Sequence, residues 1–269
     1  MNRPLPIFAL VAAMSFGVGV AALAQSDRAE RFMDDCRHSR SDNAQFCETR
    51  ELKLPLAKSL TVDGRQNGGI TVHAWARNET KVTALIQAHA ETEAEAQDIA
   101  KRIVISTTGA DVRANGPRGH DDESWSVSYE IWAPRHTELS LTASNGGISV
   151  DGMDARMELE TVNGGLKLTD VAGDVRGTTV NGGVTAELSG DRWNGAGLDL
   201  RTSNGGVHLL LPNNYSAQLE TGTVNGGMDI GFPITVQGTF GRRLATQLGS
   251  GGPRVRAVTT NGGVSIRRR

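Results

Sequence analysis

Two aspartates, Asp151 and Asp170, come nearest to a catalytic arrangement, because they occupy similar places in neighbouring copies of a short repeat. A pair of carboxylates is the minimum that glycoside hydrolysis requires. Each of the two also adjoins a turn, since Asp151 precedes Gly152 and Asp170 lies shortly before Gly173. Aspartate is common in turns for its local hydrogen bonding. We expect turn residues here, and a polysaccharide-acting enzyme on a β-helix scaffold stays the alternative.

Other catalytic signatures do not occur in the sequence. There is no nucleophile elbow, P-loop, dinucleotide fingerprint or H-E-x-x-H motif. The glycine-rich turns lack the lysine and the following helix that phosphate binding uses. The acidic run His120 to Glu123 reads as a solvated loop. We therefore expect no catalytic residues, no cofactor and no metal, which is to say no enzyme.

Aromatic side chains are scarce, at 4% of the chain. Sugar sites commonly present an aromatic ring, so the tryptophans are the candidates for ligand contact. Trp193 lies in an apparent insertion between two repeats and is the one candidate for ligand binding. We expect the other three, Trp75, Trp125 and Trp132, to pack or to cap the fold.

The N-terminus has the features of a secretion signal. Arg3 precedes an apolar run from Leu5 to Leu23, and Ala22-Leu23-Ala24 fits a cleavage site, so cleavage is expected before Gln25. An uncleaved membrane anchor is the alternative. No later segment approaches the ~20 apolar residues of a spanning helix. The sequence thus predicts an exported protein, periplasmic, secreted or at the cell surface, with no transmembrane span after cleavage.

The two cysteines, Cys36 and Cys47, follow the signal closely. In an exported chain the default is one disulfide that closes a short loop. A metal pair with His38 is the alternative, although that spacing matches no standard zinc pattern. Residues 25–51 are accordingly predicted to be a disulfide-containing N-terminal extension.

Charge is nearly balanced. The formal net charge is −2, and loss of Arg3 with the signal changes it to −3. A nucleic-acid-binding protein would carry a basic footprint, so we expect no nucleic-acid partner. An envelope polymer or protein remains the expected partner.

The elements that must position these residues are set by a repeated triplet. Asn-Gly-Gly occurs seven times, beginning at Asn67, Asn145, Asn163, Asn181, Asn204, Asn225 and Asn261. Three 18-residue units run without a gap over 137–190, and the later spacings are 23, 21 and 36 residues. The last spacing equals two periods, so we expect a degenerate unit there that has lost the motif or keeps only Ser250-Gly251-Gly252.

Apolar residues alternate with polar ones on both sides of each triplet, which is the period of a strand. Each unit therefore reads as two strands with one apolar face. Stacked units would form an all-β fold, a parallel β-solenoid of ~18–23-residue two-strand repeats, in which the asparagines make an amide ladder. The alternative is an antiparallel β-meander of Asn-Gly hairpins.

Asparagine and glycine tolerate positive φ, so the triplets are predicted to be left-handed corners. In the central copy these corner residues are Gly182 and Gly183, and a β-branched residue at Gly182 should be strained.

One helix interrupts the strands, at about 92–102. Thr92 and Glu95 form a capping box, and an apolar stripe of Ala96, Ile99, Ala100 and Ile103 follows at helical spacing. The disulfide region and this helix are the predicted caps of the stack.

The repeats resemble a known family. The segment from Gly197 to Val207, followed by Leu211-Pro212, is similar to the bacterial putative-adhesin family of β-strand-repeat proteins, a domain of unknown function. The resemblance covers about 52–269, apart from the helix and the 107–124 loop. It implies an exported β-solenoid-like domain, linked in other members to adhesion or envelope stress. It supplies no established catalytic residues, so none is assigned here.

The sequence thus predicts a signal peptide at 1–24, an extension at 25–51 and a β-repeat domain at 52–269. We expect a non-catalytic cell-envelope protein that binds through its strand surface, and the resemblance implies a role in adhesion or in an envelope-stress response. The degenerate unit and the 25–51 region are where this chain departs from the family pattern.

Overall fold

The structure is a computed structural model that describes residues 19–39, 43–119, 122–233 and 241–269, with side chains described from Arg28 onward. The chain divides into two compact units, one ending at Ser39 and one running from Arg40 to Arg269. The first unit contains helix α1 (Gly19–His38). The predicted signal peptide falls largely outside the described residues, and α1 continues through the predicted cleavage point. No described helix has the length and apolar character to cross a membrane.

The second unit is all-β apart from helix α2 (Glu93–Arg102), so the predicted fold class is confirmed at this level. Its strands are β1 (Ala44–Leu54), β2 (Ser59–Asp63), β3 (Ile70–Trp75), β4 (Thr80–Ala90), β5 (Val104–Ser106), β6 (Asp111–Asn115), β7 (Ser124–Pro134), β8 (Glu138–Ala143), β9 (Ile148–Asp151), β10 (Asp154–Thr161), β11 (Leu166–Thr169), β12 (Ala172–Asn181), β13 (Val184–Glu187), β14 (Gly197–Asn204), β15 (Val207–Leu211), β16 (Ala217–Gly222), β17 (Met228–Ile230), β18 (Arg243–Leu248), β19 (Arg254–Asn261) and β20 (Val264–Arg268).

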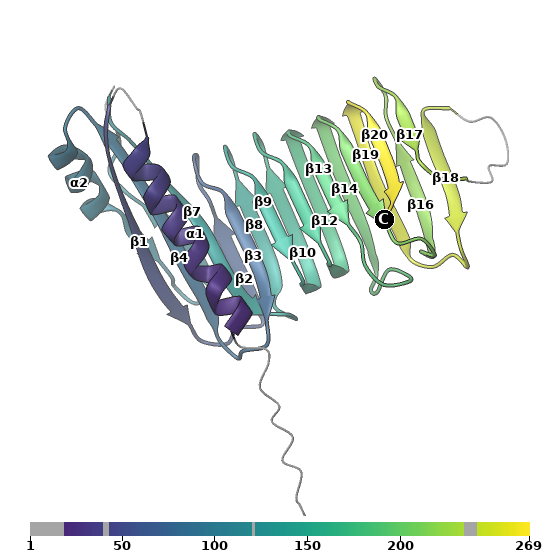
Figure 1. Cartoon of the computed structure of the whole chain (residues 1–269), viewed down its shortest axis with the longest axis horizontal. Helices are drawn as coiled ribbons and strands as arrows, with labels where there is room; N and C mark the ends of the chain where they lie inside the picture. Colours follow the sequence, from purple (N-terminus) through teal and green to yellow (C-terminus); the bar gives the residue numbers. More distant parts are fainter. Residues whose placement is uncertain (1–18, 40–42, 120–121, 234–240) are drawn as a thin grey trace, which may run out of the picture. The chain divides into compact units, whose positions relative to one another are not determined.

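The strands form two ten-stranded sheets. One has the order β1-β4-β7-β3-β9-β11-β13-β15-β20-β17, and the other has the order β18-β16-β19-β14-β12-β10-β8-β2-β6-β5. Both sheets are mixed, because antiparallel pairs lie beside a long parallel region, at the β1 end of the first sheet and at both ends of the second. Figure 1 shows this region as successive teal and green arrows.

The two strands beside each Asn-Gly-Gly triplet belong to different sheets. β8 precedes Asn145 in one sheet, and β9 follows it in the other; each pairs in parallel with the equivalent strand of the next unit. The hairpin alternative is therefore wrong for these units. Register follows the repeat, since Leu139 aligns with Met157 and Met157 with Val175.

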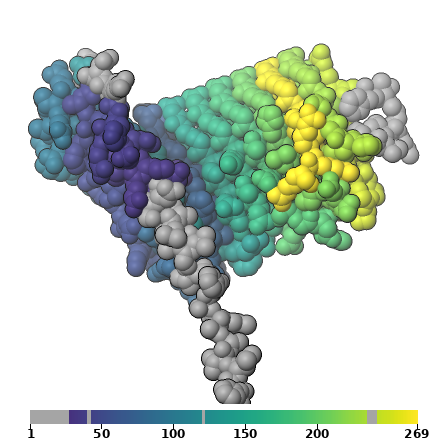
Figure 2. Space-filling view, in the orientation of Figure 1, coloured from purple at the N-terminus to yellow at the C-terminus, as the bar shows by residue number. Residues whose placement is uncertain are grey.

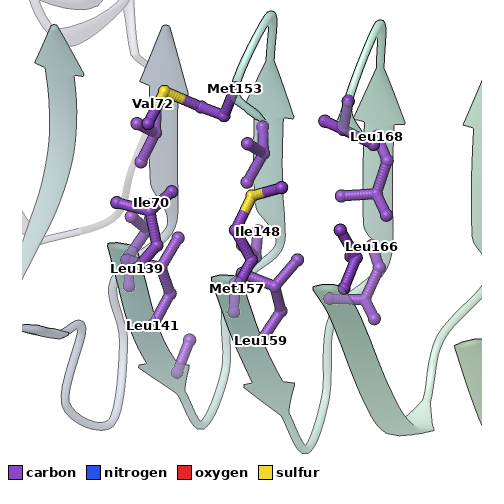
Figure 3. Packing of buried hydrophobic residues seen from close by; sticks show 14 of the residues in the cluster. Ile70, Val72, Leu139, Leu141, Ile148, Met153, Met157, Leu159, Leu166 and Leu168 are labelled. Carbon is purple, nitrogen blue, oxygen red and sulfur yellow. The ribbon is translucent and has the colours of Figure 1, made fainter. Parts of the chain in front are cut away.

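Apolar residues of both sheets meet in one core between them. Burial alternates strictly along β8, and along β10 from Arg156 to Thr161, so every second side chain there points inward. Figure 3 shows Leu139 and Leu141 from one sheet facing Ile148 and Ile70 from the other. One unit has no partner for its apolar face, so the stack of units is what removes these side chains from water.

The order of the repeats along the stack differs from their order in the sequence. Strands β19 and β20 lie between β14 or β15 on one side and β16 or β17 on the other. The predicted degenerate unit is not a coil of its own, because β18 pairs antiparallel with β16 at the edge of the sheet. Figures 1 and 2 show the C-terminal residues, in yellow, as a band between green ones.

The helix is confirmed one residue from its predicted start, with the Thr92–Glu95 capping box in place. It packs on β1 and β4. Arg50 of β1 donates hydrogen bonds to the carbonyls of Ala100 and Ile103 at the C-terminal end of α2, where the helix dipole favours a cation. Because β1 begins at Ala44, the predicted boundary between extension and repeat domain falls inside this strand.

Candidate functional site

The seven asparagines of the triplets form one continuous chain of side-chain hydrogen bonds, named here the amide ladder. In six of them Nδ2 donates to the Oδ1 of the preceding member at 2.7–3.0 Å, and the order is Asn67, Asn145, Asn163, Asn181, Asn204, Asn261 and Asn225. The predicted ladder is therefore confirmed, with Asn261 in the position that the strand order requires.

The threonine two residues before most of the asparagines ties the coils together. Thr179 Oγ1 donates to the carbonyl of Gly164 at 2.7 Å, and Thr202 Oγ1 donates to that of Gly182 at 2.7 Å. Thr161, Thr223 and Thr259 make the same contact. All five threonines are buried. A buried hydroxyl without a partner would be costly, and the glycine carbonyl of the next coil supplies that partner.

The first glycine of each triplet is required by close contact between coils. A Cβ on Gly182 would lie 2.1 Å from the carbonyl oxygen of Gly164, and for all seven first glycines the nearest backbone oxygen is at 2.0–2.3 Å. The second glycine has more room, as at Gly183, where the corresponding distance is 3.6 Å. The prediction of left-handed corners is wrong, because no residue of the seven described triplets has φ in the positive range. The first glycine is needed because a side chain would collide with the neighbouring coil, and not because the backbone has a positive φ.

A polar groove lies at the first member of the ladder. It has a volume of about 780 Å³, which is within the range of small-molecule sites. We call it the Asn67 groove, and its lining residues come from the β2–β3 turn, the end of β6 and the loop and strand that follow. They are Gly64, Arg65, Gln66, Asn67, Ala114, Asn115, Gly116, Pro117, Arg118, Gly119, Glu123, Ser124, Trp125, Ser126 and Val127.

Arg65 is held in the groove wall by a strained and well-anchored backbone. Its φ is 54°, a left-handed conformation that is uncommon for arginine. The backbone amide donates to Asp63 Oδ1 at 2.8 Å, and the carbonyl accepts from the amide of Ser144 at 3.0 Å. The side chain donates from Nε to the carbonyl of Ala114 and from Nη2 to Asn115 Oδ1 at 2.7 Å. Strain that is fixed by so many contacts commonly marks a functional position.

Trp125 forms another part of the wall. Its indole N–H donates to the carbonyl of Pro117 at 2.8 Å, which fixes the ring. A Cβ on Gly116 would lie 2.7 Å from that ring, so only glycine allows the loop to pass this closely. The tryptophan is partly buried and contributes an aromatic surface to the groove.

Tyr129 is fully buried near the same residues. Burial raises the pKa of its hydroxyl, and the Asp63 carboxylate adds to the rise, while the Ala114 amide and Arg65 oppose it. That hydroxyl makes no hydrogen bond of normal geometry to any described residue. Polar groups in a protein interior normally have hydrogen-bond partners, so a buried phenol without a firm partner destabilises the fold.

Trp193, the predicted ligand-binding tryptophan, is buried in the core and is only 2% exposed. Its indole N–H donates to the carbonyl of Gly173 at 3.0 Å. The ring therefore packs in the hydrophobic core and offers no surface to a ligand. The sequence could not distinguish this from exposure, because the insertion has no periodic pattern.

The two aspartates weighed as a catalytic pair are engaged separately. Asp151 lies 3.6 Å from His73 Nδ1, and Asp170 accepts a hydrogen bond from the Ser189 hydroxyl. Asp170 also has φ 50°, which fits the predicted turn role. His73 in turn stacks on Trp132 at 4.5 Å between ring centroids and approaches Glu130 at 3.7 Å.

Both cysteines, Cys36 and Cys47, are disulfide-bonded. Within the described ranges, no group of three or more His, Cys, Asp or Glu side chains is arranged to hold a metal. His120 and Asp121 of the acidic loop lie outside the described residues.

The groove residues were missed in the sequence because they come from separate segments. Arg65 and Gln66 differ from the Thr-x that precedes five of the other six triplets, and that difference was the one available signal. Trp125 had been expected to pack, which it does in part.

Comparison with known proteins agrees with the resemblance seen in the sequence. The model of the Toastrack DUF4097 family matches residues 51–267. A search of curated proteins found no match.

Two solved structures align over nearly their whole length. A "putative cell adhesion protein" from Clostridium sporogenes is 13% identical with a TM-score of 0.47, covering 84% of this chain and 100% of that one. A "putative adhesin" from Bacteroides fragilis is 11% identical with a TM-score of 0.43, covering 83% and 97%. These values are too low to support an argument about function.

Proposed function

Because the chain belongs to the Toastrack DUF4097 family, whose description names no activity, we propose that it is an exported, non-catalytic binding protein of the cell envelope. It presents its stacked repeats as a rigid β-solenoid and holds an envelope polymer or protein partner. The observation that carries this proposal is the Asn67 groove, whose wall residues are fixed in place before any ligand arrives. Such preorganisation reduces the entropy lost on binding.

The amide ladder supports the rigidity that this function needs. Each coil is joined to the next by strand pairing, by an asparagine side chain and, in most coils, by a buried threonine. A surface fixed by three kinds of contact changes little on binding, so its shape can select a partner.

The engagement of the acidic residues supports the non-catalytic part of the proposal. Asp151 faces His73, and Asp170 is held in a turn by Ser189, so each carboxylate has a local partner. Glycoside hydrolysis would require both to flank one sugar linkage. Membership of an envelope-stress response is a further proposal that rests on the family resemblance alone.

Co-sedimentation tests the proposed function. Residues 25–269 would be incubated with purified envelope fractions over a salt series, together with Arg118→Gln in the groove and Arg176→Gln on β12 as a matched surface control. Saturable pelleting that is weakened by Arg118→Gln and not by Arg176→Gln is the expected result, with the difference shrinking as salt screens the arginine. An absence of pelleting by the unaltered protein would overturn the proposal, and release of reducing ends from envelope glycans would overturn its non-catalytic part.

A further inference from the structure

The arginines of the Asn67 groove favour a ligand that carries a carboxylate. Arg65 and Arg118 line it with one carboxylate, that of Glu123, and the Asp63 carboxylate lies outside the lining at 3.9 Å from Arg65 Nε. Two of the five N–H groups of Arg65 are used by Ala114 and Asn115, and the Nη1 donors have no acceptor among the described residues. A guanidinium presents its donors in a planar fork that matches a carboxylate.

The uncharged groups of the groove suit hydroxyls. Gln66, Asn67 and Asn115 offer side-chain amides, and Ser124 and Ser126 offer hydroxyls. Such groups both donate and accept, as sugar hydroxyls do. Asn67 is the end of the amide ladder: its Oδ1 accepts from Asn145, and its Nδ2 makes no hydrogen bond to a described residue.

The aromatic surface completes the set. Trp125 is fixed by its bond to Pro117 and can pack against the apolar C–H face of a ring, while its edge stays fixed. None of the lining residues belongs to a helix, so the groove lacks the helix N-terminus that favours free phosphate.

We infer that the Asn67 groove binds a carboxylate-bearing sugar unit of an envelope glycan. The inference rests on the proposed binding function and names the chemical class of its ligand. The two arginines contact the carboxylate, the amides and serines contact hydroxyls, and Trp125 lies against the sugar ring.

Isothermal titration calorimetry tests this with residues 25–269. The probes are a glucuronate-containing oligosaccharide, a neutral glucose oligomer of equal length, sodium acetate and inorganic phosphate. The variants are Arg118→Gln and Arg65→Asn, the latter because asparagine tolerates a left-handed backbone and so removes the guanidinium with little strain. Arg176→Gln serves as the control, and circular dichroism checks that each variant is folded.

The expected result is saturable binding of the glucuronate oligomer, with the neutral oligomer bound roughly tenfold more weakly or worse, as loss of a charge-assisted contact implies. Each groove variant should lower the affinity for the acidic oligomer by roughly tenfold, and the control should not. Equal binding of the two oligomers would overturn the inference. So would competition by acetate or phosphate at the same concentration as the glucuronate oligomer, which would indicate a simple anion site.

The two failures can be told apart. If the protein pellets with envelope fractions but binds no glucuronate oligomer, the ligand class is wrong and the envelope-binding function stands. If it binds neither, both are wrong.

Discussion

The Asn261 side chain donates a hydrogen bond of 2.8 Å to the side-chain oxygen of Asn204, 57 residues earlier, although Asn225 lies between them in the sequence. Asn225 in turn donates to Asn261 at 2.8 Å. The C-terminal coil is therefore an interior member of the stack, with neighbours on both sides. Removal of this coil would separate the coils on its two sides, whereas removal of a terminal coil would only shorten the stack.

Removal of residues 254–269 should accordingly abolish cooperative folding of the whole repeat region. In a linear stack the loss of a terminal repeat removes one set of contacts, whereas loss of an interior one separates its neighbours. Circular dichroism and size-exclusion chromatography measure the outcome, with a chain lacking only Arg268 and Arg269 as control. A truncated chain that melts like the control would show that β19 and β20 are dispensable.

Gly182→Ala should destabilise the fold by about 3 kcal/mol or more, because the added Cβ would meet the Gly164 carbonyl oxygen, a backbone atom that cannot move alone. Gly183→Ala is the matched control, since its Cβ would have ordinary contact distances at 3.6 Å. Urea unfolding compares the two. Equal losses of stability would argue against clearance between coils as the reason for the first glycine.

Thr179→Val should cost about 1 kcal/mol of unfolding free energy, because it removes the buried hydroxyl that donates to the half-buried carbonyl of Gly164 while the shape of the side chain is kept. The adjacent Thr178 is exposed on the same strand, so Thr178→Val provides the control. Thermal unfolding of both variants checks this. A loss at Thr178 as large as that at Thr179 would indicate a strand effect unrelated to the hydrogen bond.

Alkaline conditions should weaken the fold through its tyrosines. The chain has two, Tyr129 and Tyr215, and burial raises the pKa of both above the ordinary value of 10.0. The folded state holds these protons more tightly than the unfolded state does. The stabilisation that this represents is complete below about pH 10 and is lost as the pH rises further.

Urea unfolding from pH 8 to pH 11, together with the tyrosinate absorbance, measures the effect. Tyrosinate should appear only as the protein unfolds. Tyr129→Phe should reduce the pH dependence and raise stability near neutral pH, because it removes a buried hydroxyl that lacks a firm partner. Ionisation of both tyrosines in the folded protein near pH 10 would contradict the prediction.

Asp199 should make the fold sensitive to acid. Burial by itself would raise the pKa of its carboxyl, but hydrogen bonds from Arg201 and Arg256 outweigh this and lower it. A lowered pKa in the folded state gives stability above the unfolded pKa that is lost as the pH falls through the folded one. Unfolding at pH 7 and pH 3 should therefore show a smaller acid effect in Asp199→Asn than in Glu160→Gln, an exposed acid on β10. Equal losses of stability at pH 3 in the two variants would show that Asp199 does not contribute to the pH dependence of unfolding.

The sequence by itself determined the local structure. Alternation of apolar residues gave the paired strands of each unit, the triplets gave their turns, and Thr92 with Glu95 gave the start of the helix. The amide ladder also followed, because each asparagine has the same place in its unit, and such residues come into register when the units stack. These features depend on contacts between near neighbours in the chain or on the repeat period alone.

Tertiary structure decided the order of the coils, the role of the glycines and the groove. Every coil makes the same asparagine contact and nearly the same threonine and glycine contacts with its neighbours. The repeat pattern therefore cannot predict whether the coil of Asn225 or that of Asn261 stacks next to the coil of Asn204. The first glycine is needed because of a carbonyl oxygen in another coil, which no local pattern reveals. Likewise the Asn67 groove joins Arg65 to Trp125 across 60 residues of sequence, and only the packing of β2, β6 and β7 brings them together.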